Sequence, residues 1–207
     1  MRRNAIVTSV VVLAVLALGA QLAIPAFVSS RVEDRLTEHG GSAQVEIHAF
    51  PATDLLGGGG DRIKVRGNGL RFDLPAQDEH VFRRMDKFDE VDTELTDFRA
   101  GPFAVGRFTL TREKPGRPYR LVLEAQSTAR ELSEYGGGLI AGPLGDFVGG
   151  IGGRLLPLGN QPIPVSIDAQ LRSDKGKAKV IDASGDIAGV PAGPFAEALA
   201  GAVAAVL

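Results

Sequence analysis

Apolar and polar residues alternate along several short stretches of the chain, as they do in strands with one buried face and one exposed face. In one of these stretches Ile63 and Val65 alternate with Arg62, Lys64 and Arg66. The alternation recurs at residues 45–49, 61–66, 70–74, 91–95, 103–110, 119–125, 163–169 and 178–180. The pattern predicts a sheet of about seven to nine strands that is apolar on one face and polar on the other.

Proline and glycine mark where these strands end or bend. Pro51 has no N–H group to donate, so it ends the first strand after Ala49. The dipeptide Asn68-Gly69 favours a turn, although a bulge fits nearly as well. At Gly106 the alternation slips by one position, which is typical of a bulge and predicts a curved sheet. Lys175-Gly176 predicts the turn between the last two strands, and we expect the sheet to be antiparallel.

The N-terminal segment is strongly apolar. Arg2 and Arg3 precede the run from Ala5 to Val28, whose polar members are a threonine, a serine and a glutamine. As a helix, this run would be about 36 Å long, enough for the ~30 Å hydrocarbon core of a bilayer. It fits an uncleaved signal anchor, which its length favours, or a signal peptide cut near Ala17-Leu18-Gly19. Both interpretations predict a targeting helix over residues 1–28. They also place residues 29–207, as one domain, outside the cytoplasmic membrane.

Further helices are expected before the first strand and in the C-terminal part of the chain. Residues 25–39 should continue the first helix until Gly40-Gly41 ends it, because their apolar residues recur every four positions. Ser127 or Thr128 should cap a helical region near residues 128–156. A last helix should cover residues 194–207.

The segment from 136 to 158 combines an apolar face with a glycine face. In helical projection Leu144, Phe147 and Ile151 lie on one side, and the glycines lie on the other. Each glycine lowers helix stability by roughly 1 kcal/mol relative to alanine. Two interpretations follow. The glycine face lets the helix pack closely against the sheet, or the weak helix is a mobile wall of a lipid cavity.

Composition and motifs argue against several classes of function. The net charge of −2 does not suit a nucleic-acid surface, which would be basic. The chain has no cysteine and no tryptophan, so it has no disulfides, no thiol chemistry and few groups that stack on bases. It has neither a Gly-x-Ser-x-Gly nor a His-Glu-x-x-His motif, and no Lys-Ser/Thr pair follows Gly57 to Gly60. We therefore expect no catalytic residue, no metal and no cofactor.

One region resembles a known family. After the first strand come Phe50-Pro51, Leu55-Leu56, a glycine loop, Asp61-x-Ile63-x-Val65 and Gly69-x-x-Phe72. This order is similar to the LmeA-like phospholipid-binding family of actinobacterial envelope proteins, and the resemblance extends more loosely from Arg31 to Gly189. Two segments depart from the family pattern. Gly57 to Gly60 replaces a more polar loop, and the charged segment 77–87, a loop or short helix, looks like an addition.

The resemblance implies an α+β fold with an N-terminal transmembrane or signal helix and a curved antiparallel sheet packed with helices, on the plan of tubular lipid-binding (TULIP) modules. It implies a non-enzymatic protein that holds acyl chains in an apolar trough and supports envelope lipid or lipoglycan maintenance. The implied partners are phospholipid and the cytoplasmic membrane, not nucleic acid. The residues expected to line the trough are Phe50, Leu56, Ile63, Val65, Phe72, Leu74, Leu144, Phe147 and Ile151.

Two other functions fit the same residues. An anchored structural or partner-binding envelope protein would have a packed core and no lipid cavity. Apolar strands look the same in sequence whether they face each other or a lipid. A lipid hydrolase would need a catalytic triad that is assembled only in space.

Overall fold

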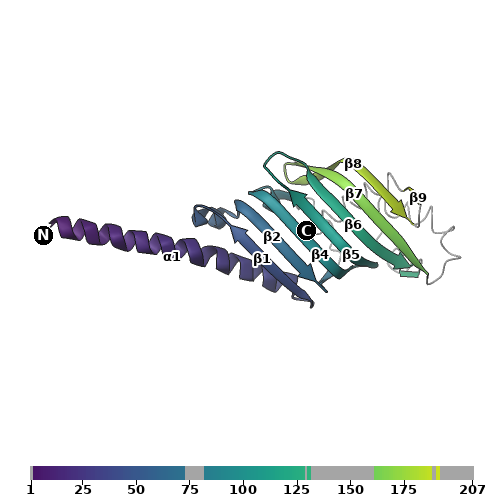
Figure 1. Cartoon of the computed structure of the whole chain (residues 1–207), viewed down its shortest axis with the longest axis horizontal. Coiled ribbons are helices and arrows are strands. Elements are labelled where there is room, and N and C mark those ends of the chain that lie inside the picture. The colour runs from purple at the N-terminus through teal and green to yellow at the C-terminus, as the bar shows by residue number, and fades with distance from the viewer. Residues whose placement is uncertain (1, 73–81, 129, 132–160, 188–189, 192–207) are drawn as a thin grey trace.

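The computed structural model describes residues 2–72, 82–128, 130–131, 161–187 and 190–191. A long helix, α1 (Arg2–Leu36), leads into a curved sheet, and its N-terminal half projects away from that sheet (Figure 1). The other elements are β1 (Ser42–His48), the 3-10 helix η1 (Ala52–Gly57), β2 (Gly60–Asn68), β3 (Arg71–Phe72), α2 (Phe82–Met85), β4 (Phe88–Ala100), β5 (Phe103–Arg112), β6 (Tyr119–Thr128), β7 (Pro162–Asp174), β8 (Lys177–Ile187) and β9 (Val190–Pro191).

Within these residues the strands form one nine-stranded sheet in the order β1-β2-β4-β5-β6-β7-β8-β9, with β3 also beside β4. Neighbouring strands from β4 to β9 are antiparallel, and so are β1 and β2. The predicted one-sided sheet is confirmed. The prediction of a wholly antiparallel sheet is wrong, because β2 and β3 both run parallel to β4.

The parallel pairing arises because the chain does not turn back at Asn68-Gly69. Gly69 adopts a φ of +66°, and its N–H donates to the carbonyl of Thr96 at 3.2 Å. Asn68 faces Thr96 and Arg71 faces Arg99, so β2 and β3 keep one register along β4. The dipeptide interrupts a single strand path, which is closer to the predicted bulge than to the predicted turn. A parallel pair needs a crossover connection, and the chain between β3 and β4 provides it.

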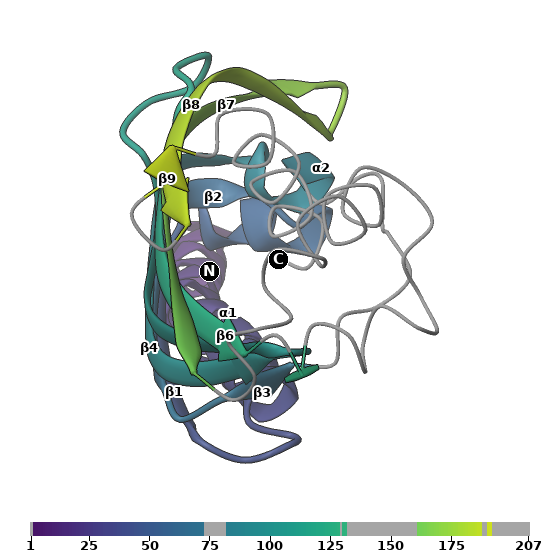
Figure 2. The same cartoon turned by 90° about the vertical axis from the view of Figure 1, so that its right-hand side faces the viewer.

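Register shifts accompany the curvature of the sheet. The predicted bulge at Gly106 is confirmed by a shift between Val105 and Arg107 where β5 pairs with β6. A second register shift lies between Gln170 and Leu171 where β7 pairs with β8, opposite Ile181 of β8. Viewed end-on, the sheet is a crescent (Figure 2). The predicted turn at Lys175-Gly176 is also confirmed, and both residues have positive φ, as a type I′ hairpin requires.

Helix α1 covers the free edge of the sheet. The backbone N–H of Val45 in β1 donates to the Glu33 carboxylate at 2.7 Å. The side chain of Gln21 donates to the carbonyl of Ala49 at 2.7 Å and accepts from the N–H of Ala52 at 2.8 Å. Ile24, Val28, Val32 and Leu36 of α1 pack against the core. An edge strand offers unpaired backbone groups to other chains, and α1 satisfies one of them, the N–H of Val45, and covers this side of the sheet.

Two expectations about helices are confirmed and others fall outside the described residues. Thr128 is a cap: its Oγ1 accepts from the N–H of Glu131 at 3.1 Å, and the Glu131 carboxylate accepts from the N–H of Thr128 at 3.1 Å. The charged segment 77–87 contains the short helix α2. The expected helices over residues 132–156 and 194–207 lie outside the described residues. In the part of the chain that is described, no helix is long and apolar enough to cross a bilayer.

Candidate lipid-binding site

The inner, concave face of the sheet is apolar along rows that cross the strands. Residues that face each other in neighbouring strands lie on the same side of a sheet, so pairing extends the alternation of one strand across its neighbours. One row consists of Val45, Val65, Thr93, Leu110, Leu121 and Ala169. All six side chains are buried, and Thr93 is the polar member of the row. The apolar face is therefore continuous from β1 to β7.

A second row lies two residues further along the strands. It consists of Gly67, Leu95, Phe108, Leu123 and Ile167. The Phe98 ring lies edge-on to Phe108, with 6.4 Å between the ring centroids. A Cβ on Gly67 would lie 2.6 Å from Cδ1 of Leu70 and 2.8 Å from Cδ2 of Leu95. Glycine at position 67 thus makes room for Leu70, which is fully buried in this face.

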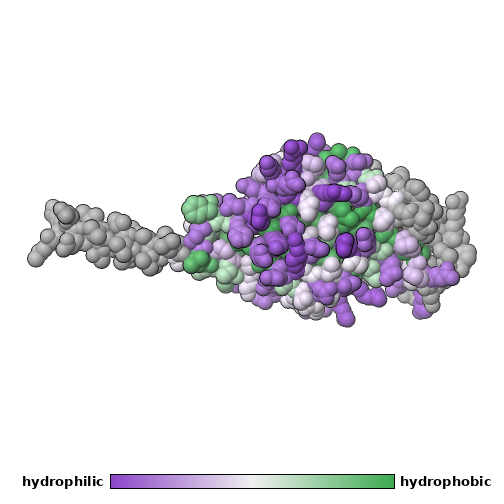
Figure 3. Space-filling model, viewed as in Figure 1, coloured by the Kyte–Doolittle hydropathy of each residue, from purple (hydrophilic) through white to green (hydrophobic). Residues whose placement is uncertain are grey.

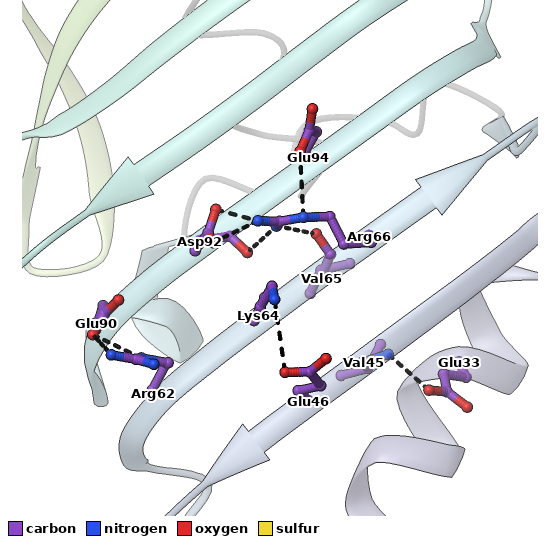
Figure 4. Close-up of polar contacts among 10 residues, drawn as sticks. All are labelled: Glu33, Val45, Glu46, Arg62, Lys64, Val65, Arg66, Glu90, Asp92 and Glu94. Carbon is purple, nitrogen blue, oxygen red and sulfur yellow. Dashed lines mark hydrogen bonds and ion pairs between the residues drawn. The ribbon is translucent and has the colours of Figure 1, made fainter.

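The outer, convex face carries the alternate residues of the same strands and is largely hydrophilic (Figure 3). On β1, β2 and β4 opposite charges face each other across the strands (Figure 4). The pairs are Arg66–Asp92 at 2.6 Å, Arg62–Glu90 at 2.7 Å, Arg66–Glu94 at 3.3 Å and Lys64–Glu46 at 3.8 Å. These side chains are about one-third exposed or more, so each pair adds little stability. On these three strands the outer face is a charged, solvated surface that does not suit acyl chains.

A buried polar cluster closes one end of the inner face. Arg112 follows Phe108 and Leu110 on the inner side of β5, and its guanidinium is almost fully buried. It donates to the Asp86 carboxylate at 3.1 Å and to the carbonyls of Met85 and Phe88. The carboxylate of Asp86 also accepts from the hydroxyls of Tyr119, at 3.0 Å, and Ser173. The cluster ties α2 and β4 to the ends of β5, β6 and β7. Arg112 was not predicted as a site residue, although a charge on the apolar phase of a strand is a signal of such a cluster.

Tyr119 is held neutral within this cluster. Burial raises the pKa of its hydroxyl, the Arg112 guanidinium lowers it, and the Asp86 carboxylate raises it again, with a net rise. The Arg112 guanidinium carbon lies 4.6 Å from the centroid of the Tyr119 ring. Phe82 of α2 stacks on the same ring at 4.3 Å. The neutral hydroxyl is a hydrogen-bond donor that helps to balance the Asp86 charge.

The structure separates the residues that were predicted to line the trough. Val65 is buried on the inner face, and the half-buried Ile63 faces Ile47 and Val91. Phe50 and Leu56 are 80% and 77% exposed at the end of the sheet. Phe72 forms part of the short strand β3, and its side chain is not described. Leu74, Leu144, Phe147 and Ile151 lie outside the described residues. Among the described residues, no three His, Asp or Glu side chains are placed to hold a metal ion.

Comparison with known proteins assigns the family. No curated protein and no solved structure matches the chain. The model of one family, described as LmeA-like phospholipid-binding, matches residues 19–206 and so covers the second half of α1 and the whole sheet. The chain therefore belongs to the LmeA-like phospholipid-binding family.

Proposed function

We propose that the protein carries phospholipid with its acyl chains against the inner face of the curved sheet. The observation that carries the proposal is the continuity of that face, where adjacent apolar rows run from β1 to β7 while charges gather outside. Membership of a phospholipid-binding family supports the same ligand. Acyl chains require an apolar surface shielded from water, and a curved one-sided sheet provides one when other elements cover it.

Burial of the acyl chains would supply the binding free energy. At about 0.8 kcal/mol per methylene, a chain of ~16 carbons contributes on the order of 10 kcal/mol when fully buried. Such binding needs no catalytic residue, so we propose a non-enzymatic role that supports lipid or lipoglycan maintenance in the cell envelope. Ile63 and Val65 are trough residues on the sheet, and Phe72, Leu74 and the face of Leu144, Phe147 and Ile151 complete the trough predicted from the sequence.

We place this function on the outer side of the cytoplasmic membrane. Arg2 and Arg3 are the charges that precede Arg31, and cationic flanks favour the cytoplasmic side of an apolar segment. The apolar run Ala5 to Val28 would act as the anchor or as the export signal. Because α1 continues from this run into the packed domain, an uncleaved anchor would keep the sheet close to the bilayer.

Matched tryptophan substitutions on one strand test the lipid site. Leu123 points to the inner face of β6, and the half-buried Val122 is its neighbour on the outer face. Leu123→Trp should fill part of the trough and sharply lower the phospholipid that co-purifies with the full chain, while Val122→Trp should not. Bound lipid is measured by mass spectrometry after extraction, and thermal unfolding of the delipidated variants reports on the fold.

The rival function gives the opposite result. In an anchored structural protein with a solid core, Leu123→Trp would overpack the core and lower stability by about 1–3 kcal/mol. The wild-type protein would then carry no stoichiometric phospholipid. A destabilised Leu123→Trp variant together with a lipid-free wild-type protein would show that the protein is structural and not a lipid carrier.

A further inference from the structure

We propose that the end of the sheet from which α1 emerges is a docking surface for an anionic phospholipid bilayer. The surface has two parts. The apolar tip comprises Leu22 of α1 with Phe50 and Leu56 beside η1. The basic rim comprises Arg83, Arg84, Lys87, Lys114, Arg117 and Lys175. This surface is distinct from the inner face, so the inference does not depend on a lipid trough.

Strand directions bring these segments to one end of the molecule. Strand β1 ends there and β2 begins there, and the parallel strand β4 begins beside β2. The antiparallel neighbours then place the connections 113–118 and 175–176 at the same end. Helix α1 runs antiparallel to β1, since Glu33 contacts Val45 while Gln21 contacts Ala49. Its N-terminal half therefore leaves the domain past the tip (Figure 1).

The tip exposes large apolar side chains on a rigid support. Leu22, Phe50 and Leu56 are 78%, 80% and 77% exposed. The neighbouring residues Ala52 and Leu55 are buried, and Gln21 is hydrogen-bonded to both sides of the Phe50-Pro51 segment. Apolar side chains are visible where the domain meets the helix in Figure 3. Single exposed leucines are common on protein surfaces, but a fixed group beside an apolar helix indicates an interaction site.

The rim gathers exposed cations at this end of a chain whose overall net charge is −2. Among the described residues of 52–57, 82–87, 113–118 and 175–176, the six cations of the rim outnumber the acids Asp54, Asp86 and Glu113, and Asp61, Asp89 and Asp174 flank them at the strand ends. Asp86 is already engaged by Arg112, and the six cationic side chains of the rim are exposed. At the opposite end, among described residues, the connections carry Glu38, Arg130 and Glu131. The six exposed cations of the rim therefore gather at the end that α1 leaves.

A bilayer fits this surface better than a protein partner does. The helix that passes the tip carries no charged residue from Ala5 to Val28. If the interior of a bilayer takes up this run, the same bilayer would contact the tip. Phe50 and Leu56 then enter the interface while the rim meets lipid phosphates. Each cation near an anionic surface contributes roughly a fivefold gain in affinity, which corresponds to about 1 kcal/mol.

The absence of tryptophan from the chain allows a site-specific test. The full chain carrying Phe50→Trp is reconstituted into vesicles of brominated phosphatidylcholine with phosphatidylglycerol, and its emission is compared with that of Phe103→Trp. Phe103 lies at the opposite end of the sheet, so Phe103→Trp is the same substitution at a position away from the tip. We expect blue-shifted and bromine-quenched emission from position 50 and unchanged emission from position 103. Leu56→Trp is a second reporter of the tip, and far-UV circular dichroism verifies each fold.

Charge-reversal substitutions distinguish the contribution of the basic rim to membrane binding from that of the apolar tip. In the Phe50→Trp background, Arg83→Glu with Arg84→Glu should reduce quenching toward the value in vesicles of phosphatidylcholine alone. Arg71→Glu with Arg107→Glu changes the net charge equally away from the rim and should leave the quenching unchanged. Solvent-like emission from both position 50 and position 56 in folded protein would overturn the proposal and point to a protein partner. Quenching that is the same without phosphatidylglycerol would overturn the role of anionic lipid.

Discussion

At the scale of single residues, Arg112 shows how a charge is accommodated on an apolar face. Its side chain lies on the inner side of β5, and three groups satisfy it: the Asp86 carboxylate and the carbonyls of Met85 and Phe88. Nε of Arg112 is a buried donor without a partner among the described residues. Burying a guanidinium is expensive unless it is paired, so the cluster constrains α2 to one position at the end of the sheet.

Removing the carboxylate should therefore be more harmful than removing the whole pair. We expect Asp86→Ala to lower the free energy of unfolding by about 2–3 kcal/mol, less than for a fully buried pair because Asp86 is partly exposed. Adding Arg112→Met should recover part of the loss, since no unpaired charge then remains. Urea denaturation of both variants measures the difference. A double variant less stable than Asp86→Ala would show that Arg112 stabilises the fold without its partner.

Tyr119 should make stability depend on pH in the alkaline range. Burial raises the folded-state pKa of its hydroxyl above the usual tyrosine value of about 10, so the folded state keeps the proton to higher pH than the unfolded state does. This stabilisation is complete below about pH 10 and is lost as pH rises toward the folded-state pKa. Between about pH 10 and 11, wild-type stability should fall more steeply than that of Tyr119→Phe. Equal slopes in urea denaturation would contradict the raised pKa.

At the scale of elements, the loop from Gly57 to Gly60 fits closely against the start of β4. The Lys87 side chain donates to the carbonyl of Gly57 at 2.6 Å, and the N–H of Gly60 donates to the carbonyl of Lys87 at 3.1 Å. Gly58 has a φ of +77°, so at least one glycine here serves a left-handed turn. The loop is thus a fixed connection that sets the position of β2 against β4.

Two alanine substitutions in this loop should differ in effect. A Cβ on Gly59 would lie 2.6 Å from the backbone oxygen of Lys87, while a Cβ on Gly57 would meet nothing within 4 Å. We expect Gly59→Ala to lower stability by about 1–3 kcal/mol, because backbone must move. Gly57→Ala should be neutral or stabilise the fold by up to about 1 kcal/mol through the unfolded state. Thermal denaturation compares the two variants. Equal melting temperatures would mean that the loop backbone rearranges without loss of stability.

At the scale of the whole molecule, α1 belongs both to the N-terminal apolar run and to the domain. Gln21, Ile24 and Val28 lie inside the predicted targeting segment 1–28, yet they contact η1, β1 and the core. The family match begins at residue 19, and a signal peptide cut after Gly19 would leave a mature chain that begins one residue later, at Ala20. Either an anchored or a cleaved protein would keep these contacts.

Truncation tests this division of the helix. A chain that begins at Ala20 should retain wild-type stability, because the packed residues of α1 remain. A chain that begins at Ser30 should lose about 3–5 kcal/mol, from two hydrogen bonds of Gln21 and the burial of Ile24 and Val28. Chemical denaturation of the two truncated proteins measures the difference. Equal stability would mean that residues 20–29 contribute nothing to the domain.

The one-sided strands, the bulge at Gly106, the hairpin at Lys175-Gly176, the cap at Thr128 and the family could all be predicted from the amino-acid sequence. These features depend on residues near each other in the chain: a period of two, a residue that tolerates positive φ, or a hydroxyl three residues before a glutamate. Such local rules hold wherever the segment lies in the fold. The same alternation identified Val65 as an inner-face residue.

The order of the strands and the exposure of individual apolar residues could not be predicted, because both depend on contacts between distant segments of the chain. Pairing β2 parallel to β4 joins segments separated by a crossover, and alternation is the same for parallel and antiparallel partners. Phe50 and Leu56 look as apolar as Val65 in sequence, but exposure depends on what covers a side chain. Arg112 is buried because Asp86 and Tyr119 reach it from other elements. The position of these distant partners follows from the path of the whole chain, which local patterns do not contain.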